Sequence, residues 1–387
     1  MRIYSSERST GALAVVTLAL TLAACAPAAA PTPQRAAEAP RAGPAAPAAP
    51  TDWSAIVAAA QREGVVECAC PPRPDFARII KEGFEAANSG IRLAVTGAPL
   101  PEFPVKVGKE QEAGIYLWDV YMFGPGPEVY DLKNQGGFEP FRNYMVGPDV
   151  GTDADWAGGF QRALIDREKQ YIFAYWFSVG GQVSVNRELL PSATINAYSD
   201  LYDPMYKGKV VWVDPRSGGA GSNVGAFVYK KYGREGLKRL LVDQEALLVK
   251  GNVELAEQLM RGGKGVSLPS LSQDTLIPFV QAGVKLNLED VGGPEMVWAS
   301  VGGSTPAVFK NPPHPNATKV FINWVLSRDT QKLLGDQLGY NSARKDVAPS
   351  EPKNAPQPGT EYWIAQTEES LIEVRQEMQR VARELVP

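Results

Sequence analysis

The chain has 387 residues, 44% of them hydrophobic, and a formal net charge of −4 at neutral pH. This length is large for one hydrophobic core and favours two lobes. The slightly negative charge, with no basic block, argues against a nucleic-acid partner.

The N-terminal segment has the pattern of an export signal. Residues 11–24, GALAVVTLALTLAA, form an apolar run that is short for a membrane span and typical of a secretory signal. The run ends in LAAC, which resembles the lipobox of bacterial lipoproteins, where the cysteine is lipidated and the chain is cut just before it. We therefore expect a lipidated Cys25, with an ordinary signal peptide and a chance cysteine as the alternative.

The next segment is a tether. Residues 26–50 consist almost entirely of Ala and Pro and cannot form a core. We expect a signal peptide over residues 1–24, a tether over 25–50 and a folded body from residue 51. The lipid on Cys25 would hold this body on the outer side of a membrane, in the periplasm or on the outer face of the cell membrane.

Two further cysteines, Cys68 and Cys70, stand one residue apart in VVECACPPRP. We interpret them as two small buried thiols at a strand end. A disulfide across one residue, which would be strained, and a soft-metal or redox pair are the alternatives. With one histidine in the chain, a closed zinc site would need carboxylates to complete it.

Strands and helices alternate along the first part of the body. Residues 52–63 and 75–88 have apolar side chains at helical spacing, and the second segment places Phe76, Ile79 and Phe84 on one face. The expected strands there are residues 65–68, 91–95 and 117–122. This alternation predicts an α/β doubly wound sheet, in which ligands bind beyond the carboxyl ends of the strands.

The same alternation continues to the C-terminus. The expected strands are residues 171–177, 182–186, 209–213, 265–268, 284–288, 297–301 and 305–309. The expected helices are residues 224–233, 254–260, 272–282, 314–327, 329–338 and 361–385. The last helix carries an apolar stripe, which we expect to pack against the body.

One loop has the composition of an anion site. Residues 214–223, DPRSGGAGSN, follow a strand and precede a helix. Glycine backbone N–H groups and a helix N-terminus bind anions, and Arg216 could hold a carboxylate or phosphonate through two parallel hydrogen bonds. In the alternative interpretation Arg216 pairs with Asp214 and the glycines only make the turn.

Three segments in order resemble extracellular solute-binding proteins of ABC importers. They are WSAIVAAAQREG with FEAANSGIRL, then SDLYDPMYKGKVVWVDPRSGGAG, then PHPNATKVFINWVLSRDTQ. The resemblance covers residues 53–347 and is closest to the branch of ferric-iron and organophosphonate binders. It implies a type II two-lobe fold with a ligand cleft, with lobe one formed by 51–178 and 289–387 and lobe two by 179–288.

The resemblance implies capture of a solute by lobe closure and delivery to a membrane permease with its ATPase subunit. Ferric binders of this branch use adjacent tyrosines where this chain reads PSLSQD, and a histidine where it has Cys70. A hard ferric ion prefers anionic oxygens, so we expect a small organic anion, no metal and no cofactor. A metal-ion binder of the same fold and a ligand-presenting receptor for a sensor kinase are the alternatives.

The expected ligand-binding residues lie in loops at the strand ends. Arg216 and neighbouring loop groups would hold the anionic head, and Trp176 and Trp298 would cover an apolar part, unless these tryptophans are core residues. The full expected set is Arg73, Phe123, Trp176, Ser178, Arg216, Ser217, Gly218, Gly219, Ser222, Asn223, Ser272 and Trp298.

An enzyme is the competing class. The only histidine, His314, stands at a helix start between prolines, and neither Ser-x-x-Lys nor Gly-x-Ser-x-Gly occurs. The cleft loops also lack paired carboxylates. We therefore expect a monomeric binding protein that catalyses no reaction.

Overall fold

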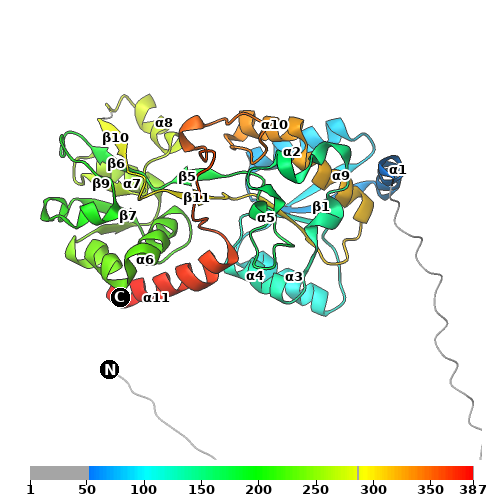
Figure 1. The fold of residues 1–387 in the computed structure, drawn as a ribbon, viewed down its shortest axis with the longest axis horizontal. Helices are drawn as coiled ribbons and strands as arrows, with labels where there is room; N and C mark the ends of the chain where they lie inside the picture. Colours follow the sequence, from blue (N-terminus) through cyan, green and yellow to red (C-terminus); the bar gives the residue numbers. More distant parts are fainter. Residues whose placement is uncertain (1–51, 286, 387) are drawn as a thin grey trace, which may run out of the picture. The chain divides into compact units, whose positions relative to one another are not determined.

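The computed structural model describes residues 52–285 and 287–386 (Figure 1). The expected signal peptide, Cys25 and the tether lie outside these residues. The described helices are α1 (Trp53–Glu63), α2 (Pro74–Ala87), α3 (Glu102–Glu112), α4 (Pro127–Asn134), α5 (Gly159–Ala163), α6 (Ala220–Lys238), α7 (Asn252–Met260), α8 (Gln273–Gln281), α9 (Pro315–Leu326), α10 (Arg328–Leu338) and α11 (Gln376–Leu385).

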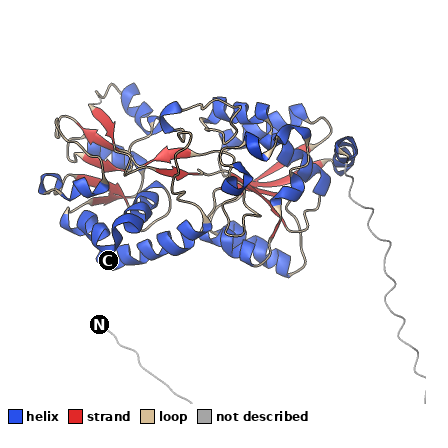
Figure 2. Cartoon of the chain, in the orientation of Figure 1, coloured by secondary structure: helices blue, strands red, loops and turns tan. Residues whose placement is uncertain are grey.

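The first sheet has five strands in the order β2-β1-β3-β12-β4. Its central strands pair in parallel, and β12 runs antiparallel to β3 and β4. Figure 2 shows helices around this sheet, and the four apolar residues on one face of α2 are buried. The strands are β1 (Val65–Cys70), β2 (Arg92–Gly97), β3 (Val120–Phe123), β4 (Phe138–Glu139) and β12 (Thr305–Phe309).

The second sheet also has five strands, in the order β10-β6-β9-β7-β8. Strand β7 pairs in parallel with β8 and β9, and β6 runs antiparallel to β9 and β10. Its strands are β6 (Val183–Asn186), β7 (Val210–Val213), β8 (Leu247–Val249), β9 (Val266–Leu268) and β10 (Leu288–Val291). Strands and helices alternate in both parts, which confirms the α/β fold class.

A small two-stranded sheet joins these parts along the chain. Strand β5 (Ser178–Gly180) leads toward the second sheet, and β11 (Trp298–Ser300) leads back toward β12. The two strands pair antiparallel, as Figure 1 shows. The expected lobe bounds, 51–178 with 289–387 and 179–288, stay a prediction.

The C-terminal segment departs from the predicted single helix over residues 361–385. Residues 363–365 are extended, because Trp363 and Ala365 exchange backbone hydrogen bonds with Ala299 of β11. Helical structure follows as a π-helical segment, Ser370–Arg375, and then α11. Met378 and Val381 of α11 are buried in the core of the second sheet, so the predicted apolar stripe does pack against the body.

Two predicted strands are also wrong in extent. Residues 171–177 form no strand, because their N–H groups bond to separate segments, such as Phe173 to Pro306 and Phe177 to Asn341. The strand of this region is β5, in the segment expected to be a connection. The strand expected over residues 284–288 is β10, which begins at Leu288.

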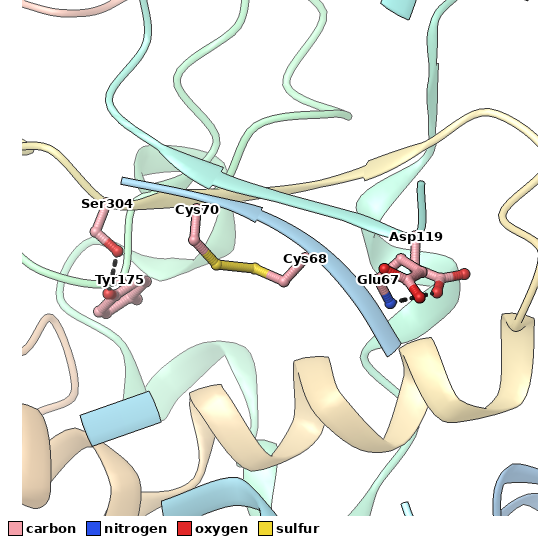
Figure 3. The surroundings of a disulfide bond; sticks show 6 residues. All are labelled: Glu67, Cys68, Cys70, Asp119, Tyr175 and Ser304. Atoms are coloured by element: carbon pink, nitrogen blue, oxygen red, sulfur yellow. Dashed lines mark hydrogen bonds between the residues drawn. A yellow bond between two sulfur atoms is a disulfide. The ribbon is translucent and has the colours of Figure 1, made fainter. Parts of the chain in front are cut away.

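The two cysteines form a disulfide, so the interpretation as free thiols is wrong (Figure 3). Residues two positions apart in a strand project from the same face. Their Cα atoms are 5.7 Å apart, within the range that a disulfide spans. Both cysteines are fully buried, between the hydrogen bond that Tyr175 makes with Ser304 and the one that Glu67 makes with Asp119.

Within residues 52–285 and 287–386, no helix combines the length and the apolar character that crossing a bilayer demands.

Candidate ligand-binding site

Three aromatic side chains, Phe123, Trp176 and Tyr340, gather where strands of the first sheet end; we call them the aromatic cluster. The Trp176 and Tyr340 rings stack with centroids 4.0 Å apart and planes 4° apart. Gly302 lies against the Trp176 ring, since a Cβ on Gly302 would stand 1.8 Å from Trp176 Cζ2. A Cβ on Gly303 would meet the Phe123 ring at 3.9 Å.

Arg73 lies beside this cluster at the start of α2. Its Nη2 is 2.5 Å from Asp75 Oδ2, and both side chains are about half exposed. Burial raises the pKa of Tyr340 to about 12, and the nearby Arg73 cation acts in the opposite direction. The structure therefore brings Arg73, Phe123 and Trp176 of the expected set together, with Tyr340 as an addition.

The Arg216 guanidinium is engaged by partners within the chain. Its Nε and Nη2 donate to Asp214 at 2.9 and 2.8 Å, and its Nη1 donates to the Val386 carbonyl at 2.6 Å. Burial acts to raise the pKa of Asp214, but the hydrogen bonds from Arg216 outweigh it and hold the pKa below its usual value. This geometry matches the alternative interpretation of Arg216.

The rest of residues 214–223, which we call the Gly/Ser loop, is shaped by short-range hydrogen bonds. Ser217 Oγ donates to the Asp214 carbonyl and Ser222 Oγ to the Gly219 carbonyl, at 2.8 and 2.9 Å. Gly219 has φ +92°, a conformation that favours glycine. A Cβ on Gly218 or Gly219 would meet nothing within 4 Å, so the loop backbone is open to an incoming group.

Arg375 adds a cation that the sequence analysis missed. Its Nη2 donates to Asn223 Oδ1 in the first turn of α6 and to the Ala365 carbonyl. Its Nε is buried without a hydrogen-bond partner, and in the described part of the chain Arg375 forms no ion pair with a carboxylate. Burial lowers the pKa of Arg375 to about 10, against a small opposing effect of Tyr130.

The remaining expected residues have structural surroundings. Trp298 is 5% exposed in the core of the second sheet, so it is placed as a core residue. Ser178 pairs with Ser300 across β5 and β11, and Ser272 caps α8 by accepting a hydrogen bond from the Thr275 N–H. Among the described residues, no group of three or more His, Cys, Asp or Glu side chains is placed to hold a metal ion.

The aromatic cluster is one group of candidate site residues on this two-sheet α/β body, and the Gly/Ser loop with Arg375 is the other. Residues 80–358 match the family model described as bacterial extracellular solute-binding protein. The match covers more than half of the chain, so the chain belongs to this family, as the sequence resemblance predicted. No curated protein matches the sequence.

Solved structures show the same fold. Iron-bound HitA from Pseudomonas aeruginosa is 17% identical, with a TM-score of 0.62, covering 84% of this chain and 99% of that chain. Ferric ion-binding protein A from Pasteurella haemolytica is 17% identical, with a TM-score of 0.62 over 83% and 98%. AfuA from Actinobacillus pleuropneumoniae, with bound fructose-6-phosphate, is 18% identical, with a TM-score of 0.56 over 84% and 98%. The predicted two-lobe periplasmic-binding fold is therefore confirmed.

Proposed function

We propose that this chain is the lipid-anchored, extracytoplasmic solute-binding component of an ABC importer and captures a small organic anion with a carboxylate or phosphonate head. The lobes close over the solute and present it to a membrane permease, which works with an ATPase subunit. No bond of the solute is broken.

One observation carries the choice of an anion. A buried cation without an acidic partner costs several kcal/mol. Arg375 is half-buried, its Nε is buried without a partner, and it lies beside the first turn of α6, a helix whose N-terminal end is itself partly positive. Two positive groups at one place favour a negatively charged ligand there. The fructose-6-phosphate bound to AfuA supports the view that this fold accepts an anionic organic solute.

The two groups of site residues would then contact different parts of the solute. The N–H groups of the Gly/Ser loop, with Ser217, Ser222, Asn223 and Arg375, would hold the anionic head. Arg216 would keep the loop in shape through Asp214. The aromatic cluster and Arg73 would cover the rest of the solute. Ser178 and Ser272 remain predicted contacts.

The anchor is a second part of the proposal. The LAAC sequence supports a diacylglycerol group on Cys25. One acyl chain gives only marginal membrane binding, so two or three chains are expected. Mass spectrometry of the native protein should find an N-terminal lipidated Cys25, and a soluble mature chain that begins elsewhere would refute this part.

The binding proposal is tested at Arg375. Methylphosphonate, 2-aminoethylphosphonate, citrate and pyruvate are titrated into the full chain by calorimetry, and the tightest binder is measured again with Arg375→Met. Loss of a charged hydrogen bond should weaken binding by about 1.5–3 kcal/mol, roughly ten- to a hundredfold. The apo protein should keep its stability, because a buried unpaired charge is removed.

The matched control is Arg383→Met on the same helix. Arg383 is exposed, and within the described part of the chain its one hydrogen bond goes to the Arg216 carbonyl, at 3.1 Å. Its substitution should leave the affinity unchanged. Equal affinities of Arg375→Met and the wild-type chain would refute the assignment, and so would equal losses in the two variants.

A further inference from the structure

We propose a second small-molecule site, built for an organic monoanion with an aromatic or branched apolar body, in a cavity separate from the two groups described above. The cavity has a volume of about 470 Å³, which is within the range of small-molecule sites. Its lining consists of Ala157, Gly158, Arg162, Phe177, residues 341–345, Val347, Pro349 and residues 355–360.

The 470 Å³ of this cavity are enough for a single aromatic ring with a carboxylate group. Its walls are largely apolar: Phe177, Val347 and Ala355 are buried, and three prolines, Pro349, Pro356 and Pro358, complete the lining. Rigid proline and phenylalanine surfaces suit a flat or branched hydrocarbon group, so they specify the body of the ligand.

The charge of the cavity lining favours an anionic head group on the ligand. Arg162, Arg344 and Lys345 line it, and none of the described residues that line it is acidic. Arg344 is neutralised by Asp346, with Nε and Nη2 each 2.9 Å from a carboxylate oxygen, and Lys345 Nζ donates to the Ala154 carbonyl at 2.7 Å. Arg162 forms no hydrogen bond or ion pair with the described part of the chain, which leaves its planar donor fork available for a carboxylate.

The cavity adjoins the aromatic cluster, because its lining residues Phe177 and Asn341 directly follow Trp176 and Tyr340 in the chain. Residues 175–177 run alongside residues 341–343, through hydrogen bonds from the Ala343 N–H to the Tyr175 carbonyl and from the Phe177 N–H to the Asn341 carbonyl. Phe177 lines the cavity, whereas its neighbour Trp176 stacks on Tyr340 and covers Gly302. The second site therefore uses its own residues and does not depend on the proposed function of the first.

The test uses benzoate, phenylacetate and 3-methylbutanoate, titrated into the full chain by calorimetry, with benzamide as the neutral counterpart of benzoate. At least one acid should bind saturably at one site, and benzamide should bind more weakly. Arg162→Gln should weaken the acid by about ten- to a hundredfold, while Arg162→Lys should keep part of the affinity. Far-UV circular dichroism and the apo melting temperature confirm that each variant is folded.

Two controls separate this site from the rest of the molecule. Arg62→Gln, on α1 and outside the cavity lining, should leave binding of the acid unchanged. Arg375→Met should also leave it unchanged, because Arg375 belongs to the first site. The proposal is overturned if none of the three acids binds, if benzamide binds as well as benzoate, or if a folded Arg162→Gln variant keeps the wild-type affinity.

Discussion

The side chains of the aromatic cluster and those of the Gly/Ser loop are held in place by different kinds of interaction. In the aromatic cluster, Trp176 is fixed by ring stacking and by close approach to the Gly302 backbone, while its Nε1 is buried without a partner. In the Gly/Ser loop, Arg216, Ser217 and Ser222 all bond within the chain. Polar loop residues that are close in sequence satisfy one another first, so composition alone does not identify the groups left for a ligand.

The largest expected effect is the loss of stability when Gly302 is replaced. A matched control separates the contribution of side-chain packing from that of backbone conformation. Gly302→Ala should lower the free energy of unfolding by about 3 kcal/mol, because a Cβ would collide with Trp176 and because φ is +61°. Gly114→Ala is the matched control, since Gly114 has φ +75° and open space around it, and should lose only about 1 kcal/mol. Urea unfolding measures both variants, and equal losses would show that the contact with Trp176 is unimportant.

A smaller effect tests whether Arg216 shapes the loop or holds the solute. Arg216→Ala should lower apo stability by about 1 kcal/mol, because it breaks a partly exposed ion pair and the bond to the Val386 carbonyl. The affinity for the tightest anion of the Arg375 experiment should change by less than about threefold. A tenfold weaker affinity with unchanged apo stability would return Arg216 to the binding site.

The smallest effect is the pH dependence of the same ion pair. The pKa of Asp214 is lowered in the folded chain, so its stabilising contribution is present above the unfolded pKa of about 3.9 and is lost as pH falls through the folded value. Asp214→Asn should be less stable than the wild-type chain by at most about 1 kcal/mol at pH 7. Urea midpoints of the two chains should converge as pH falls through the lowered folded pKa of Asp214, and a gap that stays constant there would contradict this assignment.

Much of the fold could be predicted from the sequence, because periodic apolar residues and cap residues are local signals. The α2 face is an example, with Phe76, Ile79, Ile80 and Phe84 all buried as expected. Residues 171–177 and 361–367 were mispredicted because distant partners decide their backbone. The hydrogen bonds that hold residues 363–365 extended come from Ala299, more than sixty positions earlier in the chain.

The candidate site was less predictable for the same reason. Arg73, Phe123 and Trp176 could be found because they stand at the ends of predicted strands. Arg375 lies in EVRQEMQR, a charged sequence that indicates an exposed helix face, and only the fold brings it to Asn223. The Cys68–Cys70 disulfide is only an alternative at the level of sequence, since the short spacing argues against a bridge that the strand geometry allows.

The central claim is that the solute is an organic anion, and the most direct measurement is a thermal-shift screen of the purified full chain. Its panel holds organic carboxylates, organic phosphonates, their neutral analogues and ferric ion. Because a ligand that binds only the folded state raises the melting temperature, at least one carboxylate or phosphonate should raise it in a saturable way, and its neutral analogue should not. Stabilisation by ferric ion alone, with a coloured stoichiometric complex, would contradict the account.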